Sequence, residues 1–122
     1  MLKVYFNSDT KVTPKYISFM VKDEDETIKI WLNELDYGAS PNLAQHIALY
    51  HGLFWTQQSY QIGSLTVISD DALVLGQVFD GLDCDWDSKL WLQLNRKILE
   101  KFSIAYQQAI HRSENPLYQY TI

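Results

Sequence analysis

The sequence contains one cysteine, five glycines and no long hydrophobic run. With Cys84 alone, the 122-residue chain cannot form an internal disulfide or a thiolate-rich zinc site. No stretch approaches the roughly 18 consecutive apolar residues that a membrane-spanning helix needs. No P-loop, no G-x-G-x-x-G loop and no G-x-S-x-G nucleophile motif occurs. These absences exclude proteins stabilised by internal disulfides and proteins with membrane-spanning helices. They also leave the chain without the common sequence motifs of a phosphate-binding loop or a serine nucleophile.

Positive charge is missing from the whole middle of the chain. Ten Lys and Arg against 15 Asp and Glu give a formal net charge of −5. No Lys or Arg occurs between Ile30 and Ser88. The acidic residues of this stretch are Glu34, Asp36, Asp70, Asp71, Asp80, Asp83, Asp85 and Asp87. Because a nucleic-acid backbone is neutralised by a surplus of cations, we expect no direct nucleic-acid partner.

The composition is that of a folded protein, with 47% hydrophobic and 20% charged residues. The length predicts one globular domain over residues 1–122. The amino end enters an alternating pattern at once, without the apolar run and small-residue cleavage site of a secretory signal. We therefore expect a cytoplasmic protein that has no membrane contact.

Three segments near the amino end show the two-residue period of half-buried strands. They cover residues 2–7, 15–21 and 27–32, and a polar break, 22–26, suits a tight reversal between the last two. The pattern predicts an antiparallel meander. The third segment is also compatible with an early helix.

A helix is predicted to begin at Ser40-Pro41. The serine hydroxyl can accept a hydrogen bond from a free backbone N–H, and proline is tolerated at the first helical position. Apolar residues then recur at helical spacing from Leu43 to Phe54. Gly52 is interpreted as a mark of the helix end, with 55–59 as an exit loop.

The second half of the chain predicts two further segments and a long helix. Residues 60–68 and 72–79 resemble strands, although the apolar run in 72–79 fits a short buried helix equally well. From Asp87 or Ser88 onward, apolar residues at spacings of three and four predict a helix of roughly 24 residues. The predicted fold class is α+β: an antiparallel sheet of about five strands with two helices, the long C-terminal helix packed on one face.

The acidic segment between Asp70 and Asp87 is the candidate site. It has two interpretations: a solvated loop in which Asp87 caps the last helix, or a recognition surface for a basic partner with Trp86 as its anchor. The predicted partner-binding residues are Asp70, Asp71, Asp80, Asp83, Asp85, Trp86 and Asp87. The leading hypothesis is a small acidic inhibitor that occludes a basic, nucleic-acid-handling protein by charge complementarity. Two kinds of protein fit this hypothesis: an immunity protein, and an anti-CRISPR or anti-restriction inhibitor that mimics nucleic acid.

Two other classes remain open. One is a small divalent-metal-binding domain or enzyme that uses Asp80, Asp83, Asp85 and Asp87; an EF-hand is excluded because Ser88 stands where that loop needs glycine. The other is a structural domain whose exposed aromatic residues pack in a homodimer. The main hypothesis predicts no cofactor, no metal and no enzymatic activity.

Overall fold

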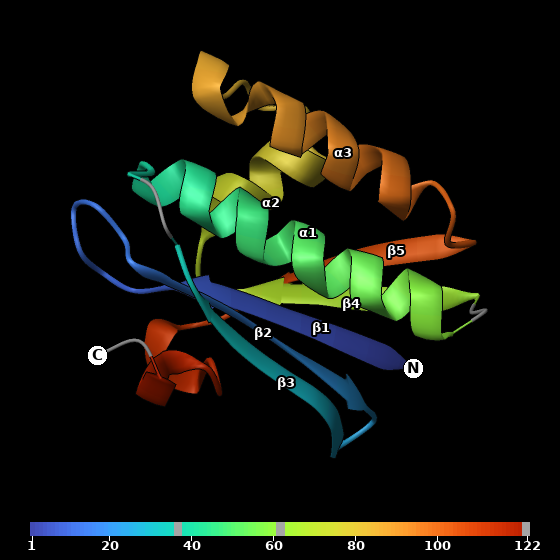
Figure 1. Ribbon diagram of the computed structural model, residues 1–122. Helices are drawn as coiled ribbons and strands as arrows, with labels where there is room; N and C mark the ends of the chain where they lie inside the picture. Colours follow the sequence, from blue (N-terminus) through green and yellow to red (C-terminus); the bar gives the residue numbers. More distant parts are fainter. Residues whose placement is uncertain (36–37, 61–62, 121–122) are drawn as a thin grey trace.

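The fold is a single five-stranded sheet with helices on one face (Figure 1). The computed structural model describes residues 1–35, 38–60 and 63–120. The main elements are β1 (Leu2–Ser8), β2 (Tyr16–Asp23), β3 (Glu26–Glu34), α1 (Pro41–Ser59), β4 (Ser64–Ser69), α2 (Ala72–Phe79), α3 (Lys89–Leu99) and β5 (Ile104–Ala109). Short 3-10 turns are formed by Trp86–Ser88, Arg112–Glu114 and Tyr118–Tyr120. Asp36 of the acidic stretch and residues 61–62 of the expected fourth strand lie outside the described residues.

The strand order is β3-β2-β1-β4-β5. The antiparallel meander predicted from the amino end is confirmed, because β1 pairs with β2 and β2 pairs with β3 in antiparallel register. The expectation of a purely antiparallel sheet is wrong. Both β1 and β5 pair with β4 in parallel, so α1 lies in a crossover between two parallel strands. The sheet is therefore mixed.

Helix α1 begins where the sequence predicts it, and the Ser40 hydroxyl accepts a hydrogen bond from Leu43 N at 3.1 Å. Its predicted end at Gly52 is wrong, since the helix continues to Ser59. A Cβ on Gly52 would lie 3.0 Å from Val4 Cγ1 and 3.2 Å from Phe19 Cβ. Glycine is needed here because the helix crosses the sheet closely, and not because the helix stops.

The carboxyl half differs most from the expectation. Residues 72–79 form helix α2, the alternative that the apolar run left open. The predicted 24-residue helix is wrong: α3 ends at Leu99 and the chain turns into strand β5. The described residues thus contain three α-helices in place of the two expected. Ser103 N donates to Gly63 O at 2.6 Å, and the following residues pair with β4. This pairing with a distant strand outweighs the local helical spacing.

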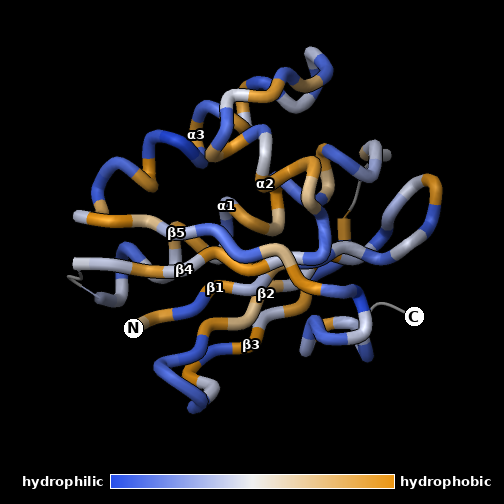
Figure 2. The backbone as a smooth tube through the Cα atoms, turned by 180° about the vertical axis from the view of Figure 1, so that it is seen from behind, coloured by the Kyte–Doolittle hydropathy of each residue, from blue (hydrophilic) through white to orange (hydrophobic). Residues whose placement is uncertain are grey.

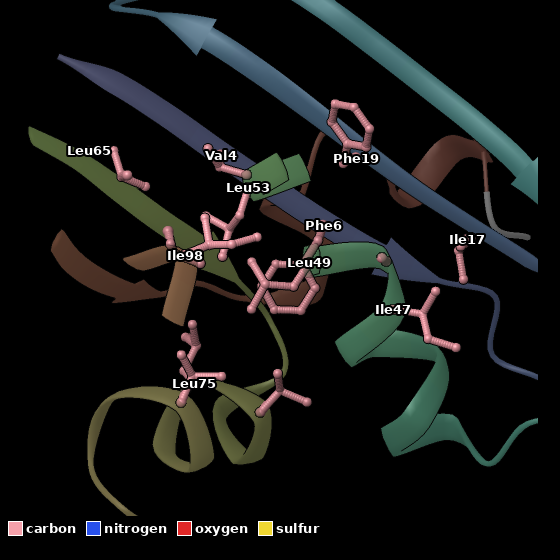
Figure 3. Packing of buried hydrophobic residues seen from close by; sticks show 14 of the residues in the cluster. Val4, Phe6, Ile17, Phe19, Ile47, Leu49, Leu53, Leu65, Leu75 and Ile98 are labelled. Carbon is pink, nitrogen blue, oxygen red and sulfur yellow. The ribbon is translucent and has the colours of Figure 1, made fainter. Parts of the chain in front are cut away.

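The hydrophobic core fills the space between the sheet and the helices. Figure 3 shows side chains of β1, such as Val4 and Phe6, near Leu49 and Leu53 of α1. Along α3, hydrophobic residues recur among hydrophilic ones (Figure 2), which is typical of a helix with one buried face. None of the described helices combines the length and low polarity that crossing a bilayer requires.

Candidate functional site

The parallel strands β1 and β4 end side by side in polar residues. Their last paired residues are Tyr5 and Ile68, and two positions further along each chain lie Asn7 and Asp70. The first turns of α1 and the segment around Arg112 close this edge of the sheet. Together they form a pocket of about 200 Å³, here named the strand-end pocket. It is lined by Asn7, Ser8, Asp9, Thr10, Lys11, Pro41, Gln45, Asp70, Asp71 and Arg112.

An amide pair lies between β1 and α1 in this pocket. Asn7 Oδ1 accepts hydrogen bonds from Ser8 N at 3.0 Å and from Gln45 Nε2 at 3.2 Å. The backbone donor of Ser8 sets the orientation of the Asn7 amide, and Asn7 in turn sets that of Gln45. Gln45 is only 8% exposed, and in the described part of the chain its Oε1 has no hydrogen-bond partner. The pocket therefore contains a buried acceptor without a donor.

Asn115 joins the carboxyl-terminal segment to both strands. Its Nδ2 donates to Asp70 Oδ1 at 2.8 Å and to Phe6 O at 3.3 Å. Its Oδ1 accepts a hydrogen bond from Leu117 N at 3.0 Å. Asn115 is 2% exposed, and its bonds with Phe6 O and Leu117 N are buried, whereas the bond to Asp70 is partly buried. They position the Asp70 carboxylate at the pocket.

Asp71 caps α2 by accepting a hydrogen bond from Val74 N at 3.0 Å. Burial raises the pKa of the Asp71 carboxyl above its ordinary value, and the nearby charge of Asp70 adds to this shift. The Val74 N–H acts in the opposite direction because it stabilises the ionised form. Asp71 thus combines a helix-capping role with a place in the pocket.

Asp9 shapes the loop that brings a lysine to the pocket. Its carboxylate accepts hydrogen bonds from the backbone N–H groups of Lys11, Lys15 and Tyr16 at 3.0, 2.7 and 2.9 Å. Lys11 then lines the pocket, as does Arg112, whose guanidinium lies 5.4 Å from the centroid of the Tyr118 ring. The pocket therefore holds cationic groups beside its acidic ones.

The structure divides the predicted partner-binding residues between the two ends of α2. Asp70 and Asp71 lie at its start, in the strand-end pocket. Asp80 lies at its other end, where both carboxylate oxygens accept hydrogen bonds from Gln107 Nε2 at 3.0 and 3.2 Å. The remaining predicted residues, Asp83, Asp85, Trp86 and Asp87, follow in the segment before α3. Trp86 is 86% exposed, so it does not belong to the core.

Two aspartates of this later segment accept hydrogen bonds. Asp83 Oδ1 accepts a hydrogen bond from Cys84 N at 3.0 Å, and Asp87 Oδ2 accepts one from Ser40 Oγ at 3.4 Å. Among residues 1–35, 38–60 and 63–120, no group of three His, Cys, Asp or Glu is placed to hold a metal ion. Burial, and next the charge of Asp83, raise the pKa of the Cys84 thiol, as expected of a poor nucleophile.

A second polar network lies buried among the three helices. Gln77 Oε1 faces His46 Nε2 at 2.7 Å and accepts a hydrogen bond from Asn42 Nδ2 at 2.9 Å. Gln77 Nε2 donates to Asp83 O at 3.1 Å, and Asn95 Nδ2 donates to His46 O at 3.1 Å. Burial lowers the pKa of His46, so its ring is neutral near pH 7. This network holds α1, α2 and α3 together.

A larger groove of about 590 Å³ lies between α1 and α3. Its lining includes Tyr50, Phe54, Lys97 and Lys101. None of its lining residues, within the described chain, carries a buried polar side-chain atom without a partner. We therefore take the strand-end pocket, which contains such an atom, as the candidate functional site.

The overall structure is similar to solved ribonuclease structures over nearly its full length. RNase H1 from the halophilic archaeon Halobacterium salinarum matches with a TM-score of 0.85 at 16% identity, covering 98% of this chain and 92% of that one. The chain has an RNase H-like fold. The N-terminal RNase H domain of a Mycobacterium tuberculosis protein matches with a TM-score of 0.82 at 16% identity, covering 98% and 95%. LC11-RNase H1, solved in complex with an RNA/DNA hybrid, matches with a TM-score of 0.82 at 14% identity, covering 99% and 93%. No family model and no curated protein sequence matches the chain.

The RNase H-like fold corrects the functional hypothesis drawn from charge. An inhibitor of the immunity-protein or anti-CRISPR type, and a chain without enzymatic activity, were expected, but the matched structures are enzymes of the RNase H1 type. The expected basic protein partner and the expected absence of nucleic acid are likewise overturned, because this fold carries an RNA/DNA hybrid in LC11-RNase H1. That a partner contacts the predicted site residues stays a prediction for all seven: Asp70, Asp71, Asp80, Asp83, Asp85, Trp86 and Asp87.

Sequence reasoning missed most of the pocket. Asn7, Gln45 and Asn115 lie far apart in the sequence and come together only because β1 and β4 are parallel neighbours. One signal was present: the polar runs that begin at Asn7 and at Ser69 each follow an apolar strand pattern. In parallel strands such runs meet at one edge of the sheet, where ligands commonly bind.

Proposed function

We propose that this protein handles nucleic acid by binding an RNA/DNA hybrid at the strand-end pocket. The observation that carries the proposal is the match to RNase H1 structures over 98–99% of the chain, one of them bound to an RNA/DNA hybrid. The pocket adds support, because it lies at the carboxyl ends of parallel strands and contains polar groups from β1, α1 and β4.

Two cations offer phosphate contacts at the pocket, although the net charge of the chain is −5 and Asp9, Asp70 and Asp71 line the same pocket. Lys11 and Arg112 both line the pocket, and both are exposed. Asp80 and the acidic residues after it lie beyond the other end of α2. A phosphate that enters from the side of Lys11 and Arg112 meets cations before it meets these carboxylates.

The buried amides supply the hydrogen bonds that nonspecific charge contacts lack. Gln45 Oε1 is an acceptor without a partner in the described chain, and it suits a ligand group that carries an O–H or N–H donor. Because an unpaired buried acceptor costs free energy, a ligand donor at this position is favoured. Hydrogen bonding to sugar and base groups thus complements the two cations.

The replacement Gln45→Leu tests the proposal. We expect it to weaken binding of a fluorescently labelled RNA/DNA hybrid about fivefold, because one buried hydrogen bond contributes about 1 kcal/mol. Fluorescence anisotropy at low ionic strength measures the dissociation constant. Thermal unfolding of the same sample shows whether the variant is folded.

Gln58→Leu is the matched control, because it places the same substitution near the other end of α1, where Gln58 is exposed. Its hybrid affinity should equal that of the unchanged protein. Failure of the unchanged protein to bind the hybrid would refute the proposed function. Equal affinity in all three proteins would show that the pocket is not the binding site.

A further inference from the structure

The strand-end pocket differs in its donor set from a two-metal nuclease centre. Such centres hold their ions about 3.5–4 Å apart and use them to stabilise the attacking and leaving oxygens of a phosphodiester. Mg²⁺ requires hard oxygen ligands in nearly octahedral geometry, and carboxylates are its usual protein ligands. The fit of such ions therefore depends on how many carboxylate oxygens converge in the pocket.

Side-chain amides donate hydrogen bonds to oxygen atoms that line this pocket. Asn7 Oδ1 already accepts hydrogen bonds from Ser8 N and Gln45 Nε2. Asn115 Nδ2 likewise donates to Asp70 Oδ1 at 2.8 Å. A cation beside these oxygens would face the positive ends of amide N–H bonds, which repel it.

The other carboxylates of the pocket have fixed structural partners. Asp9 accepts hydrogen bonds from three backbone N–H groups of its own loop. Asp71 caps α2 through Val74 N. Across the described parts of the chain, no three His, Cys, Asp or Glu side chains come together in a metal-binding arrangement. The residues present do not fit a pair of divalent cations.

We infer that the strand-end pocket holds no divalent cation and binds nucleic acid without one. Lys11 and Arg112 provide the positive charge beside the phosphates, and the amides of Asn7 and Gln45 provide hydrogen bonds in place of metal coordination. That the pocket binds nucleic acid without a cation rests on the proposed function. That the pocket holds no divalent cation concerns only the pocket and is tested separately.

The unchanged protein gives the first test. Thermal unfolding is measured in about 10 mM Mg²⁺ and in K⁺ at equal ionic strength, because a ligand that binds only the folded state raises the unfolding temperature. We expect equal unfolding temperatures in the two salts. Hybrid affinity in EDTA and in Mg²⁺, again at equal ionic strength, should agree within about twofold.

A double variant, Asn7→Asp with Gln45→Glu, gives the second test. Without Mg²⁺ it should unfold at a lower temperature, because it brings two buried carboxylates close to Asp70. Adding Mg²⁺ should raise its unfolding temperature by about 5 °C. The control pair, Asn33→Asp with Gln58→Glu, makes the same change of charge at exposed positions and should show no such rise. If the double variant does not fold, Gln45→Glu alone replaces it.

The outcomes separate the inference from the proposed function. A rise of about 5 °C in the unchanged protein with Mg²⁺, lost in Asp70→Asn, would overturn the inference. A hybrid affinity that falls more than about tenfold in EDTA would overturn it too, while leaving the proposed function intact. Absence of hybrid binding in both solutions would refute the proposed function, and the Mg²⁺ titration would still decide whether the pocket holds a cation.

Discussion

Replacing Lys11 and Arg112 together by glutamine should weaken hybrid binding about thirtyfold, which corresponds to about 2 kcal/mol. Both side chains are exposed and line the strand-end pocket, where each can contact one phosphate. Each lost phosphate contact also reduces the magnitude of the slope of log affinity against log salt concentration by about 0.8. The slope of the double variant should therefore be smaller in magnitude by about 1.6. Fluorescence anisotropy over a series of salt concentrations measures both quantities.

The control pair is Lys22→Gln with Lys29→Gln. Lys22 pairs with Lys3 at the opposite end of the sheet, and Lys29 lies 5.8 Å from the Trp55 ring centroid. The change of net charge is identical, so nonspecific attraction falls equally in both double variants. If the two pairs lose the same affinity and the same slope, the phosphates do not contact the pocket.

Gln77→Met should lower the free energy of unfolding by about 3 kcal/mol. Gln77 is 2% exposed, and methionine of similar length leaves the buried His46 Nε2 and the partly buried Asn42 Nδ2 without their acceptor. It also removes the bond to Asp83 O that holds the segment after α2. Chemical denaturation, with the slope of the transition checked for constancy, gives the change.

Gln107→Met provides the comparison for this prediction. Gln107 also makes two hydrogen bonds, both to Asp80, but it is exposed on β5. Its replacement should change the free energy of unfolding by no more than about 0.5 kcal/mol. Equal effects of the two substitutions would mean that the buried network contributes nothing beyond an ordinary surface contact.

Local patterns predicted the parts of the fold that local forces decide. The alternation over 2–7 and 15–21 identified β1 and β2, and the Ser40-Pro41 pair identified the start of α1. Gly52 was misread because its role depends on Val4 and Phe19, which are remote in sequence. Glycine at a close helix-to-sheet crossing has the same local appearance as glycine at a helix end.

The carboxyl half shows a stronger limit of local reasoning. Apolar residues after Leu99 continue at helical spacing, yet Ile104–Ala109 forms β5 because the free edge of β4 offers a complete set of backbone partners. The three- or four-residue spacing of apolar residues in the sequence gives no information about an unpaired strand elsewhere in the fold. The parallel pairing of β1 with β4, which brings Asn7 next to Asp70, is equally invisible to it.

Charge alone led to the wrong functional hypothesis. The cation-free stretch from Ile30 to Ser88 is a real feature of the sequence. The fold nevertheless places Asp70 and Asp71 in the pocket with Lys11 and Arg112, which come from outside that stretch. Net charge by segment therefore did not predict the local charge at the site, because strand order and not sequence distance decides which residues meet.

The most direct test follows the side-chain amides of Asn7, Gln45 and Asn115 by NMR while an unlabelled RNA/DNA hybrid is added to isotope-labelled protein. These amides lie in or against the strand-end pocket and report on contact there without any substitution. Binding at the pocket predicts that their signals shift first and furthest, together with the backbone signal of Lys11. Unchanged signals from these amides, with shifts confined to the Tyr50 groove or to the segment around Trp86, would contradict it.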